Sequence, residues 1–145
     1  MRALVCVELD AAELTASGAV VAPLWLEIGD VKFPEVGWYD FPVPVLGWWI
    51  EALRELVSST SDEATLRFMD GPFEVRLTRS GALATAAFLR RERGHGPEAM
   101  IDPRELLASV TARARALVSA LERQGLSSSQ LGRLKELGSD PGRRD

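Results

Sequence analysis

The 145-residue sequence has little of the chemistry that enzymes commonly use. It contains one histidine and one cysteine, so it forms no internal disulfide and no site built from several histidines. His95 stands between two glycines with nothing nearby to orient it, which is typical of an exposed loop residue. Cys6 lies in an apolar run near Glu8 and Asp10, and we expect a buried, unreactive thiol. The sequence therefore predicts no catalytic residue, no metal site, no cofactor and no enzyme.

Long hydrophobic runs are also missing. No run approaches the roughly 20 residues that a membrane-spanning helix needs. The first ten residues, MRALVCVELD, are interrupted by two acids and show no small-residue cleavage site, so we expect no signal peptide. No glycine-rich loop of the kind that binds phosphate is present, because Gly71 and Gly81 fit hairpin turns. Together with the single cysteine, these absences predict a cytoplasmic protein.

Charge is unevenly distributed along the chain, although the formal net charge is only -4. Residues 1–63 carry three basic and eleven acidic groups, whereas residues 64–145 carry fourteen basic and ten acidic groups. An acidic half attracts cationic surfaces and repels phosphate backbones. Nucleic-acid binding is disfavoured further, because most of the aromatic residues lie in the acidic half and most arginines in the other, whereas stacking platforms need both together.

Length and a hydrophobic content of 46% predict one domain over residues 1–138, followed by a flexible tail over residues 139–145. The order of the expected strands and helices, with antiparallel hairpins, indicates the α+β class. We expect one antiparallel sheet of about five to six strands, with helices packed on one face. A hairpin turning at Gly29-Asp30 sets Leu26 opposite Phe33, and turning the next hairpin at Asp70-Gly71 sets Arg67 opposite Glu74. The expected strands are Arg2–Leu9, Val20–Ile28 with its hairpin partner, and a meander of Ala64–Asp70, Phe73–Arg79 and Ala82–Arg91.

Helical periodicity appears in three places. A stripe of apolar residues predicts a helix from Val45 to Val57, with Trp48 off the stripe. Trp48 is then either exposed for a partner or covered by the Pro34–Pro42 loop, and we expect at least partial burial. After an expected loop over residues 92–100, Asp102 caps a second helix and Glu105 completes a capping-box-like pair. A short third helix turns three leucines inward, namely Leu131, Leu134 and Leu137.

The most informative segment is FPEVGWYDFPVPVLGWW, residues 33–49, which holds six of the ten aromatic residues. One interpretation places Phe33, Phe41 and Trp49 in the core and Trp38 at the sheet edge. The other is a binding surface, because interface hot spots favour tryptophan and tyrosine within a polar rim. Both interpretations can hold for different residues. The candidate partner-binding residues are Trp38, Tyr39, Asp40 and Trp48, with the acidic residues Glu35, Glu51 and Glu55 around them.

Two segments carry a resemblance to a known family. The run LEIGDVKFPEVGWYDFPVPVLGWW within Leu24–Leu53, followed by FMDGPFEV within Phe68–Leu77, resembles a family of small, uncharacterised bacterial proteins. In style, as single acidic α+β domains without a catalytic set, these proteins are similar to the immunity proteins that neutralise polymorphic toxins. The acidic first half with its aromatic candidates, together with the missing catalytic groups, predicts a non-catalytic protein that binds a partner with a basic surface, most concretely an immunity protein that occludes a toxin. The likeness to immunity proteins is one of general class. It assigns no residue roles.

Two other functions remain open from the sequence. The chain could be a structural or assembly protein that forms a homodimer through the outer face of the meander, where Met69, Leu83, Ala87 and Leu89 are apolar. Alternatively, paired loop carboxylates, either Asp10 with Glu13 or Glu35 with Asp40, could act as acid and base or hold a divalent cation.

Overall fold

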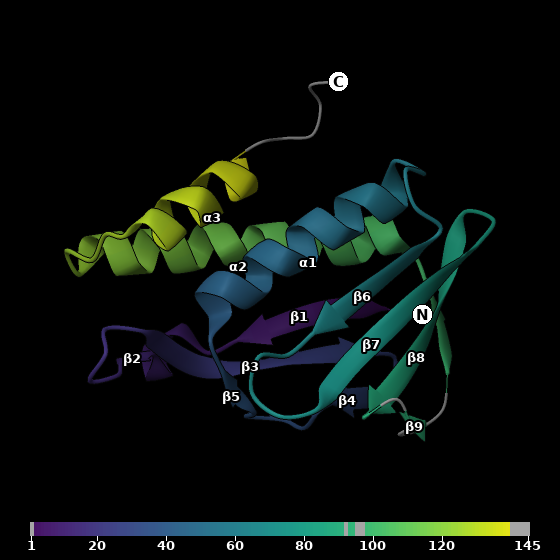
Figure 1. Ribbon diagram of the computed structural model, residues 1–145, viewed down its shortest axis with the longest axis horizontal. Coiled ribbons are helices and arrows are strands. Elements are labelled where there is room, and N and C mark those ends of the chain that lie inside the picture. Colours follow the sequence, from purple (N-terminus) through teal and green to yellow (C-terminus); the bar gives the residue numbers. More distant parts are fainter. Residues whose placement is uncertain (1, 92, 95–97, 140–145) are drawn as a thin grey trace.

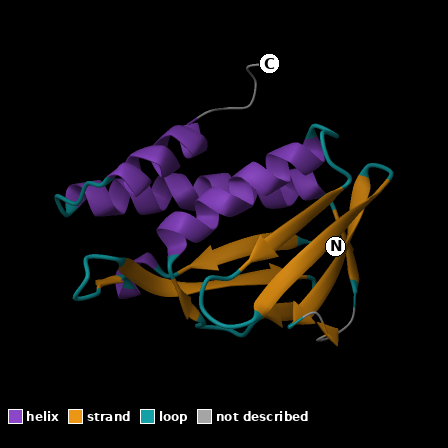
Figure 2. Cartoon of the chain, in the orientation of Figure 1, coloured by secondary structure: helices purple, strands orange, loops and turns teal. Residues whose placement is uncertain are grey.

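The computed structural model describes residues 2–91, 93–94 and 98–139. Strands form one side of the molecule and three helices lie together on the other (Figures 1 and 2). The predicted α+β class is confirmed, but within the described residues the strands form two antiparallel sheets of five strands instead of one sheet of five to six. His95 and residues 140–145 of the predicted tail lie outside the described residues.

The first sheet is organised around its long strand β3 (Val20–Ile28), with which every other described strand of this sheet pairs. The predicted hairpin register is confirmed, because Leu26 lies opposite Phe33, and Gly29 has the positive φ of 59° that its turn requires. The other elements are β1 (Ala3–Val7), the 3-10 turn η1 (Leu9–Ala11), β2 (Glu13–Leu14), β4 (Val31–Phe33) and β5 (Tyr39–Asp40).

The second sheet contains the predicted meander, and its strands run in the order β10-β8-β7-β6. The predicted pairing of Arg67 with Glu74 is confirmed, and these side chains form an ion pair at 3.7 Å. Residues 92–100 were expected to be a loop, but two short segments there pair with β8. They are too short to show a period in the sequence. The strands are β6 (Glu63–Arg67), β7 (Phe73–Ser80), β8 (Leu83–Arg90), β9 (Arg93–Gly94) and β10 (Ala99–Ile101).

The three helices are α1 (Pro42–Val57), α2 (Pro103–Arg123) and α3 (Ser129–Ser139). α1 begins three residues before the expected Val45, because proline is tolerated in a first turn whose N–H groups have no intrahelical partner. α1 and α2 lie over the sheets, and α3 packs on α1 and α2 (Figure 1). None of the described helices is long and apolar enough to cross a membrane.

α1 and α2 also satisfy backbone groups at the edges of the two sheets. Two amides of β1 donate to α2, Ala3 N–H to Glu105 Oε1 at 3.2 Å and Val5 N–H to Ser109 Oγ at 2.9 Å. At the edge of the second sheet, Trp49 Nε1 of α1 donates to the carbonyl of Arg67 at 2.8 Å. Covered edges cannot pair with other chains. Asp102 caps α2 as predicted, but the Glu105 carboxylate bonds β1 where a capping-box role was expected.

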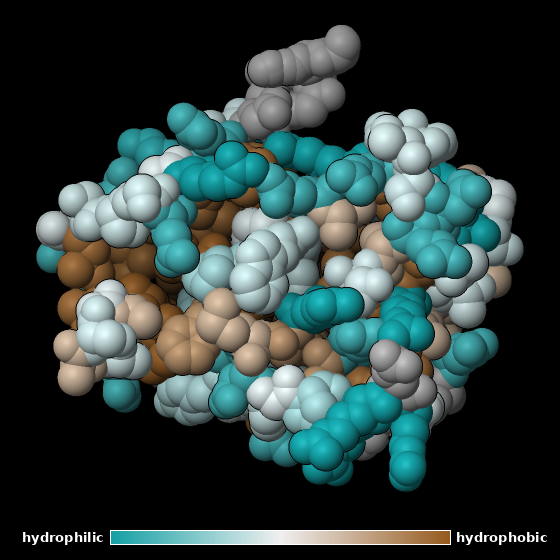
Figure 3. Space-filling model, viewed as in Figure 1, coloured by the Kyte–Doolittle hydropathy of each residue, from teal (hydrophilic) through white to brown (hydrophobic). Residues whose placement is uncertain are grey.

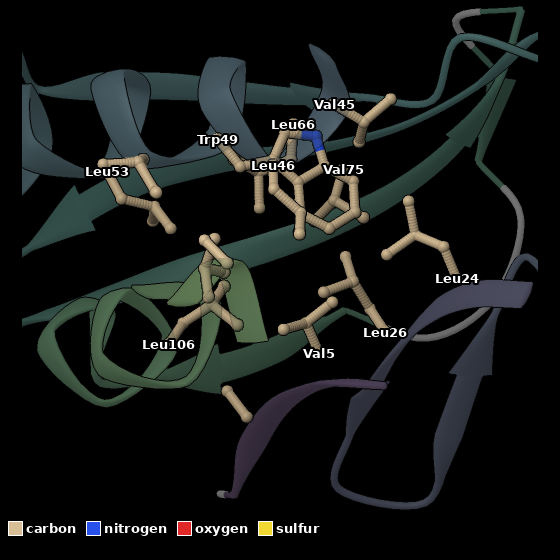
Figure 4. Close-up of a cluster of buried hydrophobic side chains, with 14 of the residues drawn as sticks. Val5, Leu24, Leu26, Val45, Leu46, Trp49, Leu53, Leu66, Val75 and Leu106 are labelled. Atoms are coloured by element: carbon tan, nitrogen blue, oxygen red, sulfur yellow. The ribbon is translucent and has the colours of Figure 1, made fainter. Parts of the chain in front are cut away.

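The hydrophobic core lies where both sheets meet α1 and α2 (Figure 4). Trp49 is fully buried and meets Phe68 edge-on, with ring centroids 5.1 Å apart. Phe33 reaches from the first sheet to the aromatic rings of the second, including Phe88 at 5.2 Å. The core interpretation of Phe33 and Trp49 is therefore confirmed, while Phe41 is only half-buried.

Candidate functional site

The structure divides the candidate partner-binding residues between two elements. Glu35, Trp38, Tyr39 and Asp40 belong to the β4–β5 connection and to β5, whereas the other three belong to α1. Tyr39 is 47% exposed, but it alternates with the buried Asp40 and so lies on the opposite face of the strand. Tyr39 therefore does not share a patch with the residues of α1, and the single aromatic surface expected from the sequence does not form.

Asp40 is 1% exposed, so its predicted place on a solvent-facing surface is wrong. Its Oδ1 accepts the backbone N–H groups of Phe41 at 2.8 Å and Met69 at 3.1 Å. Its Oδ2 accepts the backbone N–H of Asp70 at 3.1 Å and the indole N–H of Trp38 at 3.0 Å. The carboxylate thus ties β5 to the turn between β6 and β7. Because both oxygens are already bonded, Asp40 does not supply a free acid to a pair with a neighbouring carboxylate.

Trp38 belongs to the same structural junction. It is half-buried, and its ring meets Phe73 edge-on at 5.2 Å, in agreement with its predicted place at the sheet edge. Gly71 has a φ of 85°, and a Cβ there would lie 3.1 Å from the Trp38 ring. The positive φ and the nearby ring both favour glycine at this turn.

The three remaining candidates share one side of α1. At 100° per residue, Trp48, Glu51 and Glu55 fall within about 60° of one another, turned away from the core stripe. We call these three residues the α1 ridge. Trp48 is 44% exposed whereas its neighbour Trp49 is fully buried. The α1 ridge is therefore the part of the predicted surface that the structure brings together.

A small groove runs beside Trp48, between α1 and α3. Hydrophobic side chains are visible in this region of the surface, below α3 (Figure 3). The cavity volume is about 150 Å³, comparable to an engineered cavity that holds benzene. Its size thus suits one apolar side chain of a partner. The groove is lined by Val43, Pro44, Gly47, Trp48 and Glu51 of α1, and by Gln130, Arg133, Leu134 and Leu137 of α3.

The α3 side of this groove was not predicted from the sequence. The available signal was Gly47, since glycine in a helix interior costs about 1 kcal/mol relative to alanine and so points to a close approach. A Cβ at this position would lie 3.6 Å from Cδ1 of Leu137 and 4.0 Å from Cδ1 of Leu134. α3 therefore passes close to the backbone of α1 at Gly47.

Some of the acidic charge of residues 1–63 meets basic residues of the second half within the molecule. Glu51 of the α1 ridge pairs with Arg133 of α3, and Asp62 pairs with Arg79 of β7 at 3.3 Å. Glu55 forms no ion pair among the described residues and is exposed, so it keeps its negative charge at the surface. The α1 ridge is acidic, but less so than the sequence implied.

The carbonyl end of α3 is held by arginines of the other two helices. Arg54 of α1 donates to the Leu137 carbonyl at 2.5 Å, and Arg115 of α2 donates to the Gly138 carbonyl at 2.7 Å. Cations at a helix C-terminus are favourable because they complement its partial negative charge. These contacts fix the wall of the groove that α3 provides.

Cys6 lies in β1 opposite Trp25 and is half-buried instead of fully buried. Desolvation, together with the negative charge of Glu27, raises the pKa of the Cys6 thiol from 9.0 to about 11. No group of three or more His, Cys, Asp or Glu side chains placed to hold a metal occurs in the described part of the chain.

The raised pKa leads to a test of Cys6 reactivity. At pH 8 the thiolate fraction of native Cys6 is about 100-fold below that of an unshifted thiol, so alkylation by iodoacetamide is expected to be slower by about that factor. The rate should rise about tenfold per pH unit up to about pH 11. Labelling kinetics of the native chain, compared with the urea-unfolded chain, measure this difference. Equal rates at pH 8 would contradict the assigned environment.

Comparisons of the chain with protein-family models, with curated proteins and with solved structures find no match. The resemblance to small bacterial proteins therefore stays a prediction, and the functional argument depends on the geometry of the α1 ridge and its groove.

Proposed function

We propose that this chain is a non-catalytic, cytoplasmic bacterial protein that binds another protein through the α1 ridge and the adjoining groove. Its most concrete form is an immunity protein that occludes a toxin with a basic surface. The observation that carries the proposal is Trp48, which is 44% exposed beside a groove of side-chain size. Tryptophan is enriched among the residues that dominate interface energies, and an exposed tryptophan on an isolated chain is costly.

Charge supports a basic partner. Glu55 adds an exposed negative charge to the α1 ridge, and the net charge of the chain is -4. Complementary charge accelerates association and suppresses wrong partners more than it raises affinity. A partner that inserts an apolar side chain into the groove and places lysine or arginine beside Glu55 is complementary to both the shape and the charge of this surface.

Affinity capture from the native host tests the proposal. Mass spectrometry of the captured proteins and sequencing of the neighbouring gene identify the partner.

The groove leads to a prediction in which stability and binding change in opposite directions. Gly47→Ala is expected to raise the melting temperature, because alanine favours the helix by about 1 kcal/mol and its Cβ makes ordinary contacts. The same Cβ enters the groove, so affinity for the captured partner should fall. Trp48→Ala should weaken the complex by about 2 kcal/mol or more. Calorimetric titration and thermal denaturation measure the two effects.

Gly132→Ala is the matched control for Gly47→Ala. Gly132 lies in α3 with no atom within 4 Å of its added Cβ, and it does not line the groove. The change should raise the melting temperature in the same way without altering affinity. If Gly47→Ala and Trp48→Ala both bind the captured partner as tightly as the wild type does, the groove is not its docking site. A chain that captures no specific partner would refute the proposed function itself.

A further inference from the structure

The free edge of β1 faces α2 in a regular pattern, where the strand lies against the helix (Figure 1). Alternate residues of β1 turn their N–H groups away from β3, namely Ala3, Val5 and Val7. Glu105 accepts the first of these groups at 3.2 Å, and Ser109 accepts the second at 2.9 Å. Four helix residues advance about 6 Å and two strand residues about 6.6 Å, so the two series stay in step. The third helix position in the series is therefore residue 113.

This third position holds two hydrogen-bond donors and no acceptor. Arg113 carries only N–H groups, so it cannot accept the N–H of Val7. Among the described residues, no acceptor binds the Val7 N–H, and Arg113 forms no hydrogen bond or ion pair. Both residues are half-buried, and backbone donors in folded proteins are almost always paired. The missing acceptor therefore has to come from outside the described chain.

Val7 and Arg113 line one cavity, which has a volume of about 370 Å³. Ser109 lines it as well, and its hydroxyl accepts from Val5 and so keeps its own hydrogen for a further bond. Leu4 and the half-buried Cys6 add less polar wall. The volume is at the lower end of the range for small-molecule sites. It suits a small ligand that accepts hydrogen bonds.

The charges around the cavity favour a ligand with a single negative charge. Among its lining residues Arg113 is the cation and the exposed Glu8 is the acid. Close by, Glu27 lies opposite Lys32, and these two charges offset each other. A phosphate dianion would meet twice the repulsion from Glu8 that a carboxylate meets. Because no net positive field remains, binding depends on direct hydrogen bonds and is weak.

We infer that the cavity between β1 and α2 binds a carboxylate group, one oxygen accepting the Val7 N–H and the other the Arg113 guanidinium. The first position of the series already contains such a contact, because a carboxylate oxygen of Glu105 accepts the N–H of Ala3. Hydrogen bonds between arginine and carboxylate are charge-assisted and stronger than neutral ones. A small carboxylic acid and the C-terminus of a peptide both offer this group. The site does not involve the α1 ridge and does not depend on the proposed function.

NMR titration of the isotope-labelled full chain at about pH 7, where carboxylates are ionised, tests the inference. The probes are butyrate, the acetylated tripeptide alanyl-valyl-alanine, and the same tripeptide with an amidated C-terminus. The first two should shift the Val7 amide signal with dissociation constants on the order of 1 mM, and the amidated peptide should bind at least tenfold more weakly. A peptide acid that binds at least tenfold more tightly than butyrate identifies a chain terminus as the ligand, whereas equal affinities identify a small carboxylic acid.

Arg113→Gln supplies the missing acceptor from the chain itself. Glutamine keeps the helix propensity of the position, and its amide oxygen can accept the Val7 N–H. Hydrogen exchange of the Val7 amide should therefore slow, and carboxylate binding should weaken at least tenfold. Arg123→Gln is the matched control, because it removes the same charge from the last turn of α2 outside the cavity lining. It should bind both probes as the wild type does.

Three results would overturn the inference. The first is a Val7 signal that does not respond to any probe up to about 50 mM. The second is equal binding by the wild type and Arg113→Gln. The third is equal binding of the free-acid and amidated peptides, which would show that the carboxylate is not what the cavity recognises.

Discussion

Asp40→Ala is expected to lower the free energy of unfolding by about 4 kcal/mol. The change removes the acceptor of four hydrogen bonds from a residue that is 1% exposed. Each buried donor left without a partner costs about 1–3 kcal/mol, and partial entry of water limits the sum. Since a domain of this size is stable by about 5–15 kcal/mol, a large part of its stability depends on this carboxylate. Urea unfolding followed by far-UV circular dichroism measures the change.

Asp40→Asn separates the charge from the shape of the side chain. Each oxygen of Asp40 accepts two N–H groups, so either orientation of an asparagine amide sets an NH₂ group against two donors. We therefore expect a loss of about 2–3 kcal/mol despite the unchanged volume. Asp70→Ala is the control, because it removes an exposed carboxylate in the same turn and keeps the backbone N–H. Equal stabilities of Asp40→Ala and Asp70→Ala would contradict the buried network.

Asp40 also shows where prediction from the sequence failed. The acidic and aromatic composition around it indicated a surface, and for Glu35 and Tyr39 the exposure agrees with that. The role of Asp40 depends on the turn at Met69 and Asp70, about thirty residues later in the chain. No local pattern reveals a partner at that distance, because the contact exists only after the two sheets have met.

Features with local causes were predicted well. The hairpin at Gly29, the cap at Asp102 and the pairing of Arg67 with Glu74 follow from turn chemistry, capping and cross-strand charge. The division into two sheets was missed, because the sequence does not show whether strands on the two sides of α1 pair with each other. In the structure the strands before α1 form one sheet and those after it form the other. Strand β10 was missed as well, since three residues are too short to show alternation.

The uneven charge of the sequence gave only part of the surface. The excess of acid in residues 1–63 indicated an acidic half that attracts cationic surfaces. In the folded chain Glu51 meets Arg133 of α3, and Asp62 meets Arg79 of β7 at 3.3 Å. Opposite charges on separate segments attract as the chain folds, so the balance along the sequence overstates the field at the surface. The groove between α1 and α3 was also missed, because its second wall is formed by α3, which lies far from α1 in the sequence.

The adjacent tryptophans of α1 are expected to respond very differently to truncation. Trp49→Ala should lower the free energy of unfolding by about 5 kcal/mol, since truncating a buried tryptophan to alanine costs about 3–5 kcal/mol. The loss of its Nε1–H leaves the edge carbonyl of Arg67 without that partner, which adds to the cost. Trp48→Ala should cost less than about 1 kcal/mol, because the side chain is 44% exposed and lies outside the core.

Trp49→Phe divides the expected loss at this position into packing and hydrogen bonding. Phenylalanine keeps most of the aromatic contact with Phe68 but cannot donate to Arg67, so a cost of about 1–2 kcal/mol is expected. Urea unfolding followed by far-UV circular dichroism suits all three variants, because tryptophan fluorescence itself changes with each substitution. A loss at Trp48→Ala as large as at Trp49→Ala would show that Trp48 supports the fold and would remove the main anchor of the proposed partner surface. A nearly unchanged stability, together with a weakened complex, is the result that a binding residue requires, because only then does the tryptophan serve the partner and not the core.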